Sequence, residues 1–154
     1  ANTDARIARG KPVTPAFLLG ALLWPAVAAK GSDIASAGAH EGSPINAAGQ
    51  QVLTTTLQRV SIPKRFSIPM REIWELQPRL EKCSSKRVKS VLSQRRFRAA
   101  FDLLLLRSEA SDELKPTVSF WDEQQHLFPD LVGSLPTTEI PQSKRRPRRR
   151  KRSQ

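Results

Sequence analysis

The chain has 154 residues, 38% of them hydrophobic, and a formal net charge of +12. This length fits one domain with one modest core, and the cationic excess favours polyanionic partners, nucleic acid before an anionic membrane surface. The single cysteine, Cys83, excludes an intrachain disulfide and favours a reducing compartment, and with His40 and His126 at no recognised spacing it does not make a zinc site.

The N-terminal segment is typical of two different structures. Arg6, Arg9 and Lys11 precede the apolar run AFLLGALLWPAVAA, which ends in small residues like the cleavage site of a signal peptide. The start at alanine rather than methionine, together with the prolines in and before the run, favours instead a piece of a longer chain. Because the run is shorter than the roughly 20 residues that span a bilayer, we expect no transmembrane segment.

Thr14 and Pro15 mark the start of the first predicted helix, as an N-cap followed by proline at the first helical position. This helix is expected to run from about Pro15 to Lys30, to end at Gly31, and to be apolar nearly all round, like a helix buried inside a larger protein. Residues 31–46 are rich in Gly, Ala and Ser and lack periodicity, so they are predicted to form a mobile loop.

The second predicted helix follows this loop. Asn46 is its expected N-cap, and it is expected to reach about Val60. Apolar residues at helical spacing predict an inner face made of Val52, Leu53, Leu57 and Val60.

Three prolines in the segment SIPKRFSIPMREIWELQPRL set the limits of a third helix. Pro63 is expected to stop the second helix, and Pro69 to lie in the first turn of the third, which turns Ile73 and Trp74 inward. Pro78 removes an N–H group and crowds the carbonyl of Trp74, so the third helix is expected to kink or end there.

The segment RRFRAAFDLLLLRSEA has the strongest helical pattern of the chain. It follows a short helix that Ser84 or Ser85 is expected to cap and that ends near Ser93. Its core-facing stripe is predicted to consist of Phe97, Ala100, Phe101, Leu104 and Leu105. Further leucines outside that stripe predict that this helix lies near the centre of the bundle, and a last helix is expected across Asp112 to Leu127.

The fold class that these patterns predict is all-α, a bundle of about five to six helices, because β-branched residues do not alternate with polar ones. From Ser134 onward the composition narrows to residues that cannot bury enough surface to offset chain entropy, so residues 134–154 are predicted to be disordered. This tail carries the basic run Lys144, Arg145, Arg146, Arg148, Arg149, Arg150, Lys151 and Arg152.

No catalytic or metal-binding pattern is found in the sequence. Nucleotidyl and phosphoryl transfer require clustered carboxylates, commonly Asp-x-Asp on a strand, or a Gly-rich loop ahead of a lysine, and neither occurs. Trp24, Trp74 and Trp121 each fall on an apolar helical face, which favours core packing over stacking on bases.

Two groups of basic residues in the helical part are candidates for phosphate contacts. Lys64 and Arg65 stand between the second and third helices, and Arg95, Arg96 and Arg98 cluster at the start of the RRFR helix. Cations at a helix N-terminus oppose the helix dipole, so this cluster is unfavourable unless an anion or a carboxylate neutralises its charge. Solvated helix ends without a ligand remain the alternative.

Three segments in this order, NTDARIARGKPVTPAFLLGALLWP, VSIPKRFSIPMREIWELQPRL and RRFRAAFDLLLLRSEA, resemble the C-terminal half of the bacterial poly(A) polymerases, class II nucleotidyltransferases related to the CCA-adding enzymes. The likeness covers about residues 1–125, and the tail by composition. It implies helical body and leg regions of an enzyme that adds AMP from ATP to RNA 3′ ends with magnesium. It implies no catalytic residue here, because the motif of the family's head, a Gly-Ser pair followed by an Asp-x-Asp, has no counterpart.

Composition and the resemblance together predict four regions: the end of the helical body at 1–30, a Gly/Ala/Ser-rich loop at 31–46, a leg region at 47–133 and the tail at 134–154. The loop departs from the helical continuity that the resemblance implies. The resemblance implies a cytoplasmic protein that binds RNA through the basic residues above, with RNA-decay proteins as further partners. No cofactor is expected in this chain, which is predicted to be inactive alone; ATP and magnesium are implied for the full-length family. The alternative is a non-enzymatic basic adaptor that binds RNA, the ribosome or an anionic membrane surface.

Overall fold

The computed structural model describes residues 13–38 and 42–135, which form helices joined by turns. The α-helices are α2 (Pro15–Ala37), α3 (Pro44–Leu57), α4 (Lys64–Glu81), α5 (Val88–Leu92), α6 (Phe97–Ala110) and α7 (Lys115–Leu127). Short 3₁₀ helices precede α5, precede α7 and follow α7: η1 (Ser85–Arg87), η2 (Asp112–Leu114) and η3 (Pro129–Leu131). No strand occurs in the described residues, and the all-α prediction is confirmed.

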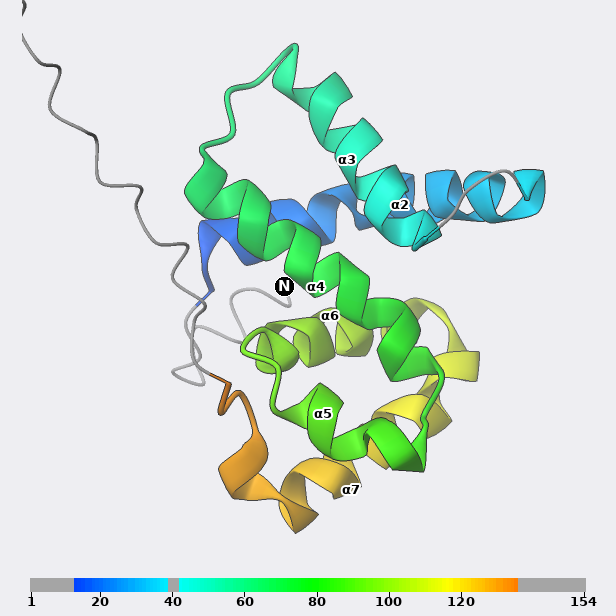
Figure 1. Ribbon diagram of the computed structural model, residues 1–154, viewed down its shortest axis with the longest axis vertical. Helices are drawn as coiled ribbons and strands as arrows, with labels where there is room; N and C mark the ends of the chain where they lie inside the picture. Colours follow the sequence, from blue (N-terminus) through cyan, green and yellow to red (C-terminus); the bar gives the residue numbers. More distant parts are fainter. Residues whose placement is uncertain (1–12, 39–41, 136–154) are drawn as a thin grey trace, which may run out of the picture.

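α4 crosses the middle of the molecule, with α2 and α3 packed on one side and α5, α6 and α7 on the other (Figure 1). Two buried tryptophans form hydrogen bonds that connect these layers to α4. The indole N–H of Trp74, on α4, donates to the carbonyl of Gly20 on α2 at 2.9 Å. The indole N–H of Trp121, on α7, donates to the carbonyl of Leu80 near the end of α4 at 2.8 Å. The core is therefore built around α4.

The start of α2 agrees with the prediction, but its end does not. Thr14 Oγ1 accepts a hydrogen bond from the backbone N–H of Phe17 at 3.2 Å, and Pro15 lies in the first turn. The helix does not end at Lys30. It continues to Ala37 and ends at Gly38, whose φ of 63° is the left-handed conformation that glycine adopts without strain.

Gly31 lies inside α2 because α3 crosses the helix closely at this point. A Cβ atom here would lie 2.7 Å from Cδ1 of Ile45. The predicted loop over 31–46 is therefore wrong for residues 31–37 and 44–46, which are helical because contact between the two helices outweighs weak local propensity. Residues 39–41, with His40, lie outside the described residues. The division into body and leg regions stays a prediction.

α2 is long and apolar enough, by length and composition alone, to cross a membrane. The expectation that this segment is too short is therefore wrong, because the helix extends past Ala29 to Ala37. A core helix of a soluble protein and a signal sequence pass the same test. The absence of a transmembrane segment remains a prediction.

Ser43, rather than Asn46, caps α3: its Oγ accepts a hydrogen bond from the backbone N–H of Asn46 at 3.3 Å. The helix ends at Leu57, and the chain then turns toward α4. Leu57 and Val60 are 46% and 57% exposed, so the predicted inner face is wrong beyond Leu53, because the helical repeat stops before it can turn those residues inward.

α4 begins at Lys64, directly after Pro63, and continues through Pro69 and Pro78. The prediction that Pro69 lies in the first turn is therefore wrong, and so is an end at Pro78. Buried side chains lie before and after Pro78, so packing on both neighbouring layers outweighs the single backbone hydrogen bond that the proline removes. Those buried residues include Trp74, Gln77 and Leu80.

The helices after α4 agree closely with their predictions. Ser84 stands at the N-cap position of η1, although its side chain forms no capping hydrogen bond, and Ser93 follows α5. η2 with α7 covers the predicted Asp112–Leu127 helix. α6 packs against α4 and α7, while α4 contacts every other α-helix of the described residues. The buried residues of α6 are Phe97, Ala100, Phe101, Leu103 and Leu104, with the predicted Leu105 only half-buried.

Candidate nucleic-acid interface

Lys64 and Arg65 form the first turn of α4. The helix can begin here because the carbonyl of Pro63 accepts the N–H of Phe66 at 2.9 Å. Both basic side chains are exposed, and the Arg65 guanidinium lies over the Phe66 ring, 4.9 Å from its centroid. Neither forms an ion pair with a described residue. Because cations at this end of a helix oppose its dipole, a bound anion would stabilise them.

Arg96 differs from its two basic neighbours. Its Nε lies 2.8 Å from Oε2 of Glu72, on α4. The Arg96 charge is therefore already paired with a carboxylate, and this ion pair links the start of α6 to α4. Arg95 and Arg98 are exposed and form no ion pair within the described part of the chain. Arg96 therefore has a structural role, whereas Arg95 and Arg98 are available to a ligand. The RNA-binding role of all three stays a prediction.

The two basic groups lie at the same side of the molecule. In the view of Figure 1, α4 and α6 both begin on the left, and the Arg96–Glu72 ion pair connects them. The described chain also ends on this side. The N–H of Gly133 donates to the carbonyl of Leu92, and that of Leu135 to the carbonyl of Ser93, each at 2.9 Å. The basic run Lys144–Arg152 lies outside the described residues, and it begins nine residues after Leu135 in the sequence.

A second group of cations, which the sequence analysis did not single out, lies at the opposite end of α4. A groove of about 1180 Å³ runs between α2, the start of α3, the end of α4 and η1. Four exposed cations line it, and none forms an ion pair with a described residue: Arg79, Lys82, Lys86 and Arg87. The density of basic residues in RLEKCSSKRVKS was the sequence signal for this group.

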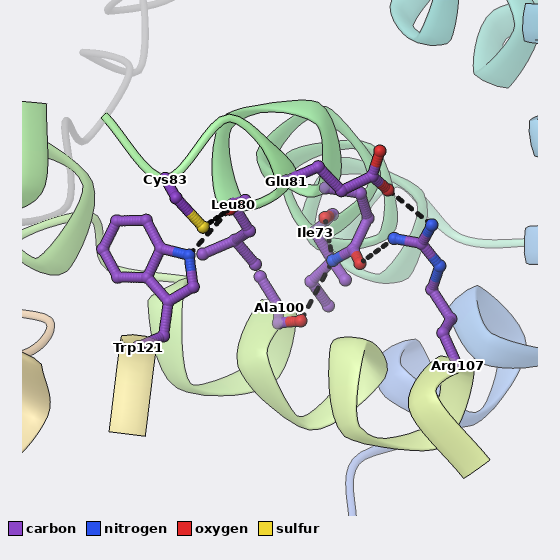
Figure 2. A network of polar contacts seen from close by, with 8 residues as sticks. Ile73, Leu80, Glu81, Cys83, Ala100, Arg107 and Trp121 are labelled. Carbon is purple, nitrogen blue, oxygen red and sulfur yellow. Dashed lines mark hydrogen bonds and ion pairs between the residues drawn. The ribbon is translucent and has the colours of Figure 1, made fainter. Parts of the chain in front are cut away.

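A polar network fixes one wall of this groove (Figure 2). The Nε2 of Gln77, on α4, donates to the carbonyls of Ile73 at 3.2 Å and Ala100 at 3.0 Å. Arg107, on α6, donates from Nη1 to Oε1 of Gln77 at 2.9 Å and from Nη2 to Glu81 at 2.5 Å.

Arg107 also reaches α2, because its guanidinium lies 4.6 Å from the centroid of a Trp24 ring. It lines the groove, but all of its contacts are internal. Arg107 therefore joins three helices and is not available to a ligand.

The described residues offer no site for catalysis by a metal ion. Among them, no group of three His, Cys, Asp or Glu side chains could hold one. The burial of Trp24, Trp74 and Trp121 confirms the predicted core role over stacking on bases.

Comparisons with known proteins agree with the sequence resemblance. The family model described as "Polymerase A arginine-rich C-terminus" matches residues 37–154. The chain is similar to poly(A) polymerase I of Escherichia coli O6:H1, with 37% identity over 153 residues, 96% of this chain and 33% of the relative. Its similarity to poly(A) polymerase I of Salmonella typhi is 34% identity over 157 residues, and to that of Haemophilus influenzae 31% over 126 residues. The chain spans about a third of the length of the first two of these relatives.

Proposed function

This chain belongs to the polymerase A arginine-rich C-terminus family of bacterial poly(A) polymerases, and from that premise we propose that it binds RNA for an enzyme that adds AMP from ATP to RNA 3′ ends. The observation that carries this proposal is that Lys64, Arg65, Arg95 and Arg98 are exposed at or next to the first turns of α4 and α6, two helices that begin on the same side in Figure 1. The last described residue, Leu135, is hydrogen-bonded to Ser93, close in sequence to Arg95, and the arginine-rich run follows it in the sequence.

Catalysis belongs, in this proposal, to the part of the relatives that the chain does not match. ATP and magnesium would be used there, since the described residues hold no cluster of metal ligands. The contribution of this chain is to bind and position the RNA. A cytoplasmic location and partners among RNA-decay proteins follow from the same proposal.

Electrostatic contact with phosphates sets the character of this binding. Each neutralised phosphate releases part of a counterion, so affinity falls with salt and depends little on base sequence. With eight cations in the tail and a slope of about −0.7 per contact on single strands, the limiting slope of log affinity against log salt is roughly −5 to −6. Between 50 and 200 mM salt this corresponds to at most about three decades of affinity.

The test compares variants of the chain in RNA affinity across that salt range. A chain that ends at Ile140 removes the basic run, and the double variant Arg95→Gln/Arg98→Gln removes the two exposed arginines before and on α6. Both are expected to bind more weakly and with a shallower salt slope than the intact chain. The charge-matched control is Lys115→Gln/Ser119→Glu on α7, because Lys115 forms only an exposed ion pair with Asp112.

The outcomes separate the parts of the proposal. Equal affinities and slopes for the shortened chain would exclude the tail and assign binding to the helical cations. An effect of the control as large as that of the arginine variant would mean that only net charge matters. Failure of the intact chain to bind RNA at low salt, with binding to anionic vesicles instead, would favour a membrane-surface adaptor and overturn the proposal.

A further inference from the structure

The groove at the C-terminal end of α4 has the properties of a second ligand site. We propose that it binds the phosphodiester backbone of single-stranded RNA through Arg79, Lys82, Lys86 and Arg87. This inference rests on the proposed function, because it takes RNA as the ligand. It adds a contact region that lies at the other end of α4 from Lys64.

The charges that line the groove favour an anion. The four cations are exposed and form no ion pair with a described residue. Two carboxylates also line the groove, Glu75 and Glu81, and Glu81 is already paired with Arg107. Cations therefore outnumber carboxylates, and the only carboxylate there without an ion pair to a described residue is Glu75. A groove lined predominantly by one sign of charge concentrates ligands of the other sign.

The size of the groove fits a strand better than a single small anion. Its volume of about 1180 Å³ is above the roughly 300–1,000 Å³ of typical small-molecule pockets. Serine hydroxyls lie among the cations and can donate further hydrogen bonds to phosphate or ribose oxygens: Ser43, Ser84 and Ser90.

The groove offers no stacking platform for bases. Trp24 and Trp121 contribute to its wall but are 8% and 0% exposed, and Arg107 covers the Trp24 ring. Sequence-tolerant binding of single strands normally combines a basic groove with exposed aromatic rings. Without those rings, the groove contacts the backbone and does not read the sequence.

The two basic regions are separated by the length of α4. A helix of 18 residues is about 27 Å long at a rise of 1.5 Å per residue. One strand of several nucleotides is needed to touch both regions. Short RNA therefore occupies one of them, while longer RNA gains affinity from both.

Lys86→Gln/Arg87→Gln is the test variant, because both side chains are exposed on η1 and the fold does not use their charges. Its affinity for a fluorescent single-stranded oligo(A) RNA is measured across a salt series, with Lys115→Gln/Ser119→Glu as the control of equal net charge. The groove variant is expected to bind more weakly and to lose roughly 1.4 from the magnitude of the salt slope, for two contacts of about 0.7 each. The control is expected to change less, and both variants should keep the melting temperature of the parent chain.

Lysine acylation with mass-spectrometric readout locates the RNA independently. Bound RNA is expected to protect Lys82 and Lys86 from the reagent and to leave Lys115 reactive. In one outcome, the groove variant binds RNA with unchanged affinity while RNA leaves these lysines unprotected. That result would overturn the proposal that the groove binds RNA, and it would leave the proposed function standing. Absence of any RNA binding would overturn both. Equal protection by polyglutamate at equal charge concentration would assign the groove to an acidic protein partner instead.

Discussion

The guanidinium of Arg107 donates a 2.9 Å hydrogen bond to the side-chain carbonyl of Gln77, the one buried polar side chain of the described residues. Gln77 uses its amide group for two carbonyls on α4 and α6, so its own oxygen depends on Arg107. A buried acceptor that loses its donor costs the free energy of its desolvation. This pair therefore couples the packing of α4 and α6.

Replacement of Arg107 by leucine is expected to lower the free energy of unfolding by about 1–3 kcal/mol, because it leaves the Gln77 oxygen buried without a donor. Denaturant unfolding followed by circular dichroism measures the loss. Arg107→Leu/Gln77→Leu should lose less than the sum of the two single variants, since the double variant removes both partners. Additive losses would show that the two side chains are not coupled.

Glu81→Gln tests the ion pair between Arg107 and Glu81. The Glu81 side chain is 42% exposed, and surface ion pairs are worth about 0–1 kcal/mol. The expected change in unfolding free energy is therefore smaller than that of Arg107→Leu. A larger effect at Glu81 would mean that the ion pair, and not the buried carbonyl, is the main contribution of Arg107.

Alanine substitutions of two helical glycines are expected to change stability in opposite directions. A Cβ on Gly49 would lie 3.0 Å from the Trp74 ring, a rigid buried side chain, so overpacking is expected to cost about 1–3 kcal/mol. A Cβ on Gly20 would lie 3.7 Å from the nearest side-chain atom, on Met70, so the gain in helix propensity of up to about 1 kcal/mol should dominate. Thermal unfolding of both variants checks the signs, and a stabilised Gly49→Ala would contradict the close packing of α3 on Trp74.

Phe101→Ala is expected to lower the free energy of unfolding by about 3–5 kcal/mol, as for other large buried aromatic residues. Phe101 is buried on α6, and its ring packs 6.1 Å from that of Phe97. Leu22→Ala is the control, because Leu22 is 75% exposed and its truncation should change stability by less than about 0.5 kcal/mol. A loss below about 1 kcal/mol at Phe101 would be incompatible with its place in the core.

The chain alone is expected not to extend an RNA primer when it is incubated with ATP and magnesium. The transfer of a nucleotide requires carboxylates that hold the metal ions, and the described residues contain no such cluster. Gel electrophoresis of a labelled primer measures the outcome. Extension that persists after removal of contaminating host polymerase would contradict the assignment of catalysis to the unmatched part of the relatives.

Local signals in the sequence predicted the helices whose limits depend on capping and spacing. Thr14 with Pro15 marked the start of α2, and the apolar spacing after Phe97 marked the buried side of α6. The same signals failed where contacts between helices decide. Local composition predicts a helix end at Gly31, because nothing local shows that Ile45 packs against it. Pro78 was expected to interrupt α4, although buried residues on both sides of it hold the helix together.

The candidate site was only partly predictable for the same reason. The sequence identified Arg95, Arg96 and Arg98 as a group, but only the fold shows that Glu72 pairs with Arg96 and leaves its neighbours exposed. The groove cations lie on the last turn of α4, at its C-cap Lys82, and on η1, on either side of the turn at Cys83. Neither the turn nor the position of α2 opposite it can be inferred from spacing alone.

The backbone hydrogen bond from Leu135 to Ser93 fixes the position of the last described residue before the tail. At no more than roughly 3.6 Å per residue, the nine steps from Leu135 to Lys144 span at most about 32 Å. An RNA strand held by the basic run therefore remains at high effective concentration near Arg95 and Arg98, and the second contact becomes intramolecular. Avidity of this kind can exceed the affinity of either contact by about 10²–10⁴, so two weak electrostatic contacts can retain RNA that neither would hold alone.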